Sequence, residues 1–77
     1  MSRSYLLYLG DIIESIEKIQ KYTRGLDYDS FSQNQLVVDV VIRNFEIIGE
    51  AASYVPGKVQ ERYQEIPWKL MKAMRNI

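Results

Sequence analysis

The chain has 77 residues, of which 47% are hydrophobic, and its ten basic and ten acidic side chains cancel to a formal net charge of zero. It contains neither histidine nor cysteine, which excludes Ser-His and Cys-His catalytic pairs, zinc sites built from imidazole or thiolate ligands, and disulfide cross-links. A neutral chain also lacks the general positive field that drives non-specific nucleic-acid binding, so an RNA contact would need a local patch.

A chain of this length forms one domain at most, and we expect residues 1–77 to fold as a single domain of marginal stability that associates with itself. No stretch approaches the roughly 18 uninterrupted apolar residues that a membrane span requires, and the first residues do not have the pattern of a signal peptide. These features and the lack of cysteine predict a soluble, cytoplasmic protein without a membrane partner.

The first predicted element is an amphipathic helix from Tyr5 to Tyr22. Its leucine and isoleucine side chains recur every three or four residues, and charged side chains fill the opposite face. Gly25 follows where a helix commonly stops. Residues 26–31 are rich in turn formers and predict a loop or a single helical turn that brings Phe31 onto the core.

A second long helix is predicted from about Gln33 to Tyr54, packed antiparallel on the first. Ser32 and Gln35 have the spacing of a capping box at its start. Residues 37–42 alone would suit a strand, but the helical period of the flanking sequence outweighs their β-propensity. The apolar positions that keep this period are Leu36, Val37, Val40, Val41, Phe45, Ile48, Ala51, Ala52 and Val55.

The remaining elements are short. Pro56 and Gly57 end the second helix, and residues 58–64 predict a short helix or an irregular connector. Pro67 suits the first turn of a last helix that carries Trp68 and Met74. The expected fold is therefore an all-α, antiparallel helical bundle with two long helices and shorter C-terminal helices.

Polar residues share one face of the second long helix. Arg43, Glu46 and Glu50 are spaced i, i+3 and i+7, so they form either a surface ion pair or a polar cluster that faces a partner subunit. Gly49 lies in the interior of the same helix, where glycine costs about 1 kcal/mol relative to alanine. It therefore indicates the close approach of another backbone.

The last predicted helix has a basic face. Lys69, Lys72 and Arg75 recur every three residues, and Asn76 lies beside them. A guanidinium suits a phosphate, although a basic helix face is more often only solvated. The residue pattern itself predicts no metal site and no cofactor.

Several sequence blocks occur in an order that resembles a known family. They are residues 43–52 with the sequence RNFEIIGEAA, the triplet Ile66-Pro67-Trp68, and the closing Met74-Arg75-Asn76-Ile77. With the opening residues 5–12, they resemble the HepT-like branch of the HEPN superfamily over nearly the whole chain.

The resemblance implies a homodimeric helical bundle that acts as a metal-independent endoribonuclease toxin. It also implies a partner, a minimal nucleotidyltransferase antitoxin, in a type VII-like pair. The family signature is Arg, four residues, His, one residue and Tyr. Arg75 and Asn76 match its first two positions and are the implied catalytic residues, whereas the His and Tyr would fall beyond Ile77.

We therefore expect the domain to be C-terminally incomplete, with poorly covered apolar helix faces, and to cleave RNA weakly or not at all. An imidazole would move the proton in the implied reaction, and Arg75 is a poor replacement for it because a guanidinium stays protonated. Two other interpretations stay open. In the first, the chain is a non-catalytic helical module for dimerisation or antitoxin binding. In the second, it is a small protein that binds nucleic acid through its basic last helix.

Overall fold

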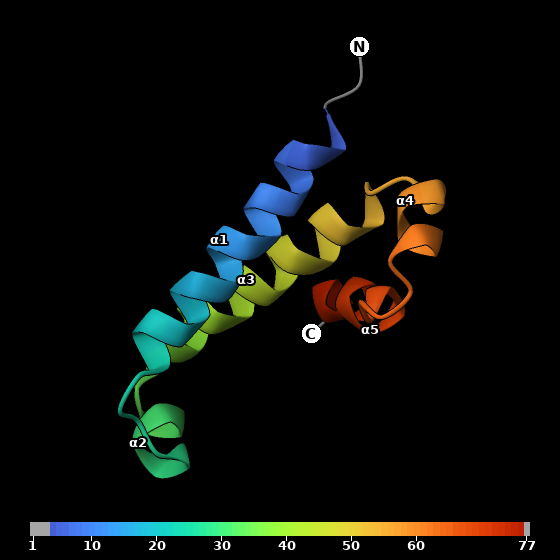
Figure 1. The fold of residues 1–77 in the computed structure, drawn as a ribbon. Helices are drawn as coiled ribbons and strands as arrows, with labels where there is room; N and C mark the ends of the chain where they lie inside the picture. The colour runs from blue at the N-terminus through green and yellow to red at the C-terminus, as the bar shows by residue number, and fades with distance from the viewer. Residues whose placement is uncertain (1–3, 77) are drawn as a thin grey trace.

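The computed structural model describes residues 4–76, which form α-helices and a closing 3-10 helix with no strand among them. The elements are α1 (Tyr5–Thr23), α2 (Tyr28–Gln33), α3 (Gln35–Ser53), α4 (Gly57–Arg62), α5 (Trp68–Ala73) and the 3-10 helix η1 (Met74–Asn76). Helices α1 and α3 lie side by side and run in opposite directions, and the C-terminal helices pack near the end of α3 (Figure 1). The predicted all-α antiparallel bundle is confirmed.

Helix α1 begins at Tyr5 as predicted and ends at Thr23, one residue after the predicted end. Its start is capped by Ser4, whose Oγ accepts a hydrogen bond from the Leu6 backbone N–H at 3.3 Å. Its end is followed by Gly25 at a φ of 78°, a left-handed backbone conformation that glycine adopts without steric cost. The predicted glycine stop is confirmed.

The start of α3 differs from the prediction. Ser32 lies inside α2, where its hydroxyl donates to the Asp29 carbonyl at 3.1 Å. The cap of α3 is Asn34, whose Oδ1 accepts from the Val37 backbone N–H at 3.2 Å. The predicted capping box of Ser32 and Gln35 is therefore wrong, because α2 takes up Ser32 and leaves Asn34 as the first non-helical residue before α3.

The apolar core lies where α1, α3 and the C-terminal helices meet. Its buried members are Ile12, Ile48, Ala51, Ala52, Val55, Val59 and Trp68. The predicted period of α3 holds, except that Leu36 is 74% exposed, since Val37 and Val41 take the inward positions near that end. Asn44 is buried in the same helix although it is polar.

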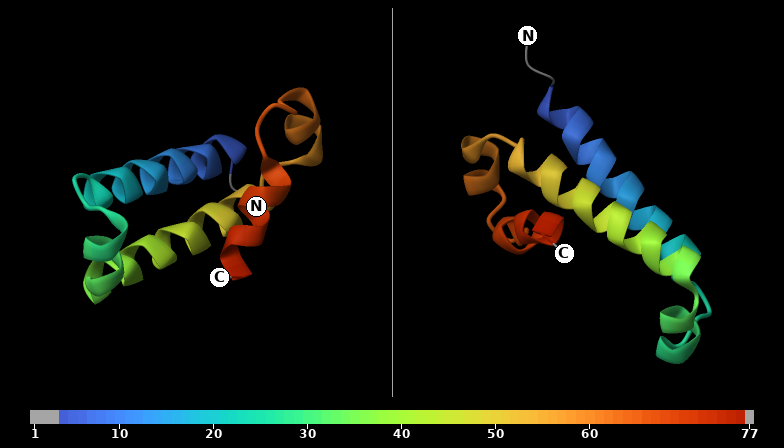
Figure 2. Two further views of the ribbon diagram at one scale, coloured as in Figure 1. Left: turned by 90° about the horizontal axis from the view of Figure 1, so that it is seen from below. Right: turned by 180° about the vertical axis from the view of Figure 1, so that it is seen from behind.

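Two side-chain hydrogen bonds hold the C-terminal helices in place, one to the residues just after α3 and the other within the C-terminal segment itself. The Gln60 side-chain amide of α4 donates to the Val55 carbonyl at 2.8 Å, just after α3. The Trp68 indole N–H donates to the Tyr63 carbonyl at 3.1 Å, and its ring is buried at the start of α5. Both views in Figure 2 accordingly place α5 beside the C-terminal half of α3.

The apolar face of α1 is only partly covered. Ile13 is 59% exposed and Ile16 is 40% exposed. They border an open apolar groove of about 520 Å³ between α1, α3 and α5, lined by Leu9, Ile12, Ile13, Ile16, Ile48, Ile66, Pro67, Trp68, Met71 and Met74. Within residues 4–76, no helix combines the length and the apolar character that crossing a membrane requires.

Candidate functional site

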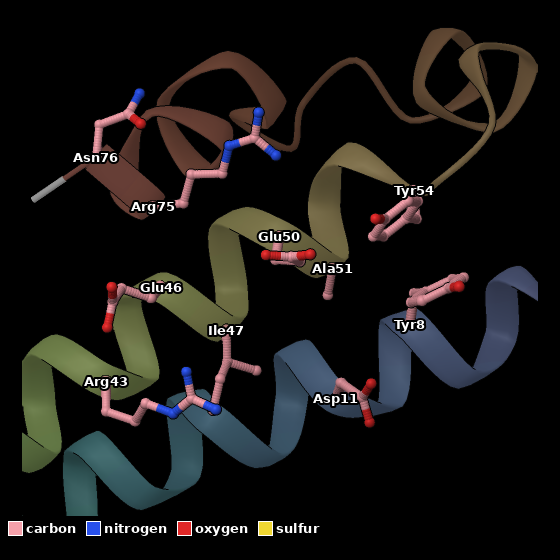
Figure 3. Close-up of a pocket in the computed structure, with 10 residues that line it drawn as sticks. All are labelled: Tyr8, Asp11, Arg43, Glu46, Ile47, Glu50, Ala51, Tyr54, Arg75 and Asn76. Atoms are coloured by element: carbon pink, nitrogen blue, oxygen red, sulfur yellow. The ribbon is translucent and has the colours of Figure 1, made fainter.

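The polar residues singled out in the sequence meet in one groove of about 530 Å³ that opens between α1, α3 and η1 (Figure 3). Helix α3 forms its floor. The lining residues are Tyr8, Asp11, Arg43, Glu46, Ile47, Glu50, Ala51, Tyr54, Arg75 and Asn76. The groove therefore joins Arg75 and Asn76 to the polar face of α3, although more than twenty residues separate these segments in the sequence.

Gly49 explains how η1 reaches α3. A Cβ atom added to Gly49 would lie 2.6 Å from the Arg75 backbone nitrogen, 2.8 Å from the Arg75 Cβ and 3.0 Å from the Met71 carbonyl oxygen. Only a residue without a side chain permits this approach, because real Cβ atoms do not come so close to a backbone. The glycine lets the segment that carries Arg75 rest directly on the helix that carries Arg43, Glu46 and Glu50.

The basic face predicted for the last helix is divided. Helix α5 ends at Ala73, and the residues after it wind as a 3-10 helix with fewer residues per turn. Arg75 consequently lines the groove on α3, whereas Lys69 lies at a separate depression with Trp68. Lys69 and Arg75 therefore line two different hollows of the surface.

The groove carries mixed charge. Arg43 and Arg75 supply its cations, and Asp11, Glu46 and Glu50 supply its carboxylates. Within residues 4–76, Arg43 makes no ion pair shorter than 4.0 Å, so the surface ion pair considered for Arg43 and Glu46 is not formed. Figure 3 gives the reason, since Arg43 extends toward Ile47 while Glu46 turns the other way.

An aromatic pair closes one end of the groove. The rings of Tyr8 from α1 and Tyr54 after α3 stack with their centroids 5.1 Å apart and an interplanar angle of 26°. Sequence reasoning did not single out Tyr8, Asp11 or Tyr54. The spacing of Tyr8 and Asp11 on one face of α1 was the available signal, but it does not reveal that this face lines the same groove as η1.

Two parts of this arrangement suit a ligand that carries a phosphate and a planar ring, whereas the three carboxylates of the groove repel an anion. A guanidinium such as that of Arg75 binds phosphate oxygens through two parallel hydrogen bonds, and a tyrosine face stacks on planar rings. Within the part of the chain that the structure describes, no three Asp or Glu side chains gather in a way that could hold a metal ion. The 77 residues also contain no histidine for proton transfer near neutral pH.

The profile of a family described as ribonuclease HepT-like matches residues 12–77. The chain belongs to this family. The resemblance found in the residue blocks is therefore confirmed.

Two relatives are similar to this HepT-like chain over nearly its whole length. A Methanocaldococcus jannaschii protein, named as a gamma-glutamylcyclotransferase and provisionally as an RNase, is 43% identical over 77 residues, which are 100% of this chain and 35% of that protein. A Thermococcus cleftensis protein named "Probable ribonuclease HepT" is 41% identical over 76 residues, covering 99% of this chain and 69% of that protein. No solved structure matches the chain.

The HepT-like chain is shorter than these relatives. It spans about a third of the length of the first and about two thirds of the length of the second. The family membership therefore applies to this chain, while the activity, substrates and partners of a complete protein are matters for proposal.

Proposed function

We propose that this chain is the RNA-binding part of a HepT-like endoribonuclease toxin, and that Arg75 and Asn76 contact the phosphodiester. The observation that carries the proposal is the placement of both residues in one groove with Arg43, in a chain of the ribonuclease HepT-like family. The groove has an open side, so a single strand can enter it without unfolding the helices.

The proposed chemistry divides into charge stabilisation and proton transfer. The Arg75 guanidinium stabilises negative charge on the phosphoryl oxygens, and Asn76 donates or accepts one further hydrogen bond. Proton transfer from the ribose 2′-hydroxyl needs a group that titrates near neutral pH, and these 77 residues contain no imidazole. Since a general acid or base contributes about 10²- to 10⁴-fold, we propose that this chain binds RNA but cleaves it weakly or not at all.

The direct test is binding of a short single-stranded RNA to the 77-residue chain and to Arg75→Gln. The variant keeps the size of the side chain and removes its charge, so the affinity should fall by about tenfold or more. Lys69→Gln is the matched control, because Lys69 is an exposed cation outside this groove. Equal losses in both variants would indicate a diffuse electrostatic effect and would reject the proposed site.

The proposed partners are a second copy of the chain and a minimal nucleotidyltransferase antitoxin. The open apolar groove that Ile13 and Ile16 border supports association, since monomeric proteins rarely expose a large contiguous apolar surface. Sedimentation at several concentrations tests the homodimer. Co-expression with a candidate minimal nucleotidyltransferase tests the toxin-antitoxin pair. A chain that stays monomeric at every concentration would count against the homodimer, and a nucleotidyltransferase that purifies without the chain would count against the antitoxin.

The same apolar groove favours a second candidate, a non-catalytic module that dimerises or binds the antitoxin. The two candidates differ in their response to single substitutions. A nuclease fragment should lose RNA affinity in the Arg75→Gln variant and keep its self-association. A binding module should lose self-association in the Ile13→Glu variant and should show no measurable RNA affinity in any variant.

A further inference from the structure

The ring of Tyr54 is stacked on Tyr8 and yet remains largely exposed, which core packing does not explain. Tyr54 is 55% exposed and lies outside the apolar core, at the residue that follows α3. Tyr8 covers one face of its ring at a centroid distance of 5.1 Å. The exposed area of Tyr54 therefore belongs to its other face and its edge, which leaves a supported aromatic surface at one end of the groove.

We propose that Tyr54, backed by Tyr8, stacks on one base of a single-stranded RNA whose adjoining phosphate is held by Arg75. This inference rests on the proposed function, because it names how that groove would hold its substrate. Figure 3 gives the relevant layout, since the Arg75 side chain extends toward the Tyr54 end of the groove. A cation and an aromatic surface along one groove are the combination that single-strand binding proteins use.

The role of Tyr8 is to keep the platform in place. An isolated exposed tyrosine loses rotamer freedom when a base stacks on it, and this loss weakens binding. The stack with Tyr8 restricts the Tyr54 ring before the ligand arrives. Tyr8 is thus a positioning residue, while Tyr54 contacts the base.

The charges of the groove limit the number of RNA phosphates that it can neutralise. Only Arg43 and Arg75 among its lining residues can neutralise phosphates, and three carboxylates line the same groove. For single strands, the logarithm of the affinity falls with the logarithm of salt concentration by about 0.7 per phosphate neutralised. Two such contacts give a slope of about −1.4, a weak dependence that leaves base stacking as a large part of the affinity.

The base preference follows from the same argument. Every base can stack on Tyr54, so the site tolerates different sequences. Adenine and guanine offer a larger planar surface than uracil or cytosine. A purine next to the bound phosphate is therefore expected to bind more tightly than a pyrimidine.

The test compares two RNA probes, a three-nucleotide adenosine RNA and the same trimer with all three bases removed. Tyr54→Ala should weaken the binding of the adenosine trimer by about fivefold or more and leave the abasic trimer unchanged. Tyr54→Phe keeps the ring and should bind both probes as the original chain does. Tyr28→Ala is the matched control, because Tyr28 is 79% exposed in α2, away from the groove.

A second measurement needs no variant. A trimer with 2-aminopurine at its central position should lose fluorescence when it binds the unmodified chain, since stacking quenches this base. Unquenched fluorescence in the bound state would overturn the inference. Tight binding of both trimers by Tyr54→Ala, equal to that of the original chain, would overturn it as well.

The two proposals fail in different ways. If both trimers bind and Arg75→Gln weakens both, but Tyr54→Ala changes neither, the stacking platform is rejected and the phosphate site stands. If neither trimer binds the unmodified chain, the proposed function and the platform are both rejected.

Discussion

The backbone nitrogen of Arg75 rests on Gly49 so closely that an added methyl group would stand 2.6 Å away from it. This contact joins the end of the described chain to the C-terminal half of α3. It decides where the Arg75 side chain lies and therefore whether the groove exists in its observed form.

Gly49→Ala is expected to lower the free energy of unfolding by about 1–3 kcal/mol, because the new methyl group overlaps the Arg75 backbone and forces η1 away. It should also weaken RNA binding. Gly10→Ala is the matched control within α1, where an added Cβ meets nothing within 4 Å. That change should stabilise the chain by about 0.5–1 kcal/mol, and chemical denaturation of both variants measures the contrast.

Trp68→Phe is expected to lower the free energy of unfolding by about 1–2 kcal/mol. The change removes the indole hydrogen bond to the Tyr63 carbonyl and part of a buried ring. Tyr63→Phe keeps that carbonyl and should change stability by less than about 0.5 kcal/mol. Thermal unfolding followed by circular dichroism distinguishes the two, and equal effects would contradict a specific role for the indole.

Asn44→Leu is expected to leave the free energy of unfolding unchanged or to raise it by about 1 kcal/mol. Asn44 is 5% exposed, and its Oδ1 has no hydrogen-bond partner among residues 4–76, although its Nδ2 donates to the Val40 carbonyl at 2.8 Å. Leucine has a similar shape and no buried polar atom. Asn44→Asp should destabilise the chain, since it would bury a charge at the same place. Chemical denaturation of the two variants measures this contrast, and a large loss of stability in Asn44→Leu would contradict the prediction.

The stability of α2 is expected to depend on pH through Asp27. The hydrogen bond from the Ser30 backbone N–H to its carboxylate lowers the pKa of Asp27 below 3.8. Because the folded-state pKa is depressed, the stabilisation is present above the unfolded-state pKa and is lost as the pH falls through the folded-state value. Asp27→Asn should therefore remove this part of the pH dependence below about pH 4.

Denaturation curves between neutral and acid pH measure that effect. Asparagine is also a good N-capping residue, so Asp27→Asn removes the charge of the side chain and keeps its capping hydrogen bond. Asp29→Asn is the matched control, because it removes the same charge from the same helix and keeps the bond to the Ser30 N–H. A parallel shift of the Asp27 and Asp29 variants at all pH values would contradict the prediction.

The helices were predictable because each depends on residues close in sequence. The period of the apolar side chains predicted α1 to within one residue and α3 to within two. The capping residue of α3 was mispredicted, since Ser32 and Asn34 are both good caps and only the formation of α2 selects between them. The sequence did not indicate that Asn44 is buried. Its side-chain amide bonds to the Val40 carbonyl of its own helix, so no partner elsewhere in the sequence marks the position.

The sequence by itself determined the all-α class, the absence of imidazole and thiol chemistry, and the blocks that mark the HepT-like family. The tertiary structure decided that Arg75 lies over Gly49 and that Tyr8 meets Tyr54. These contacts join residues that are distant along the chain, and local periodicity carries no information about such pairs. Helix formation is governed within a few turns, whereas a groove exists only after packing has set the distances between helices.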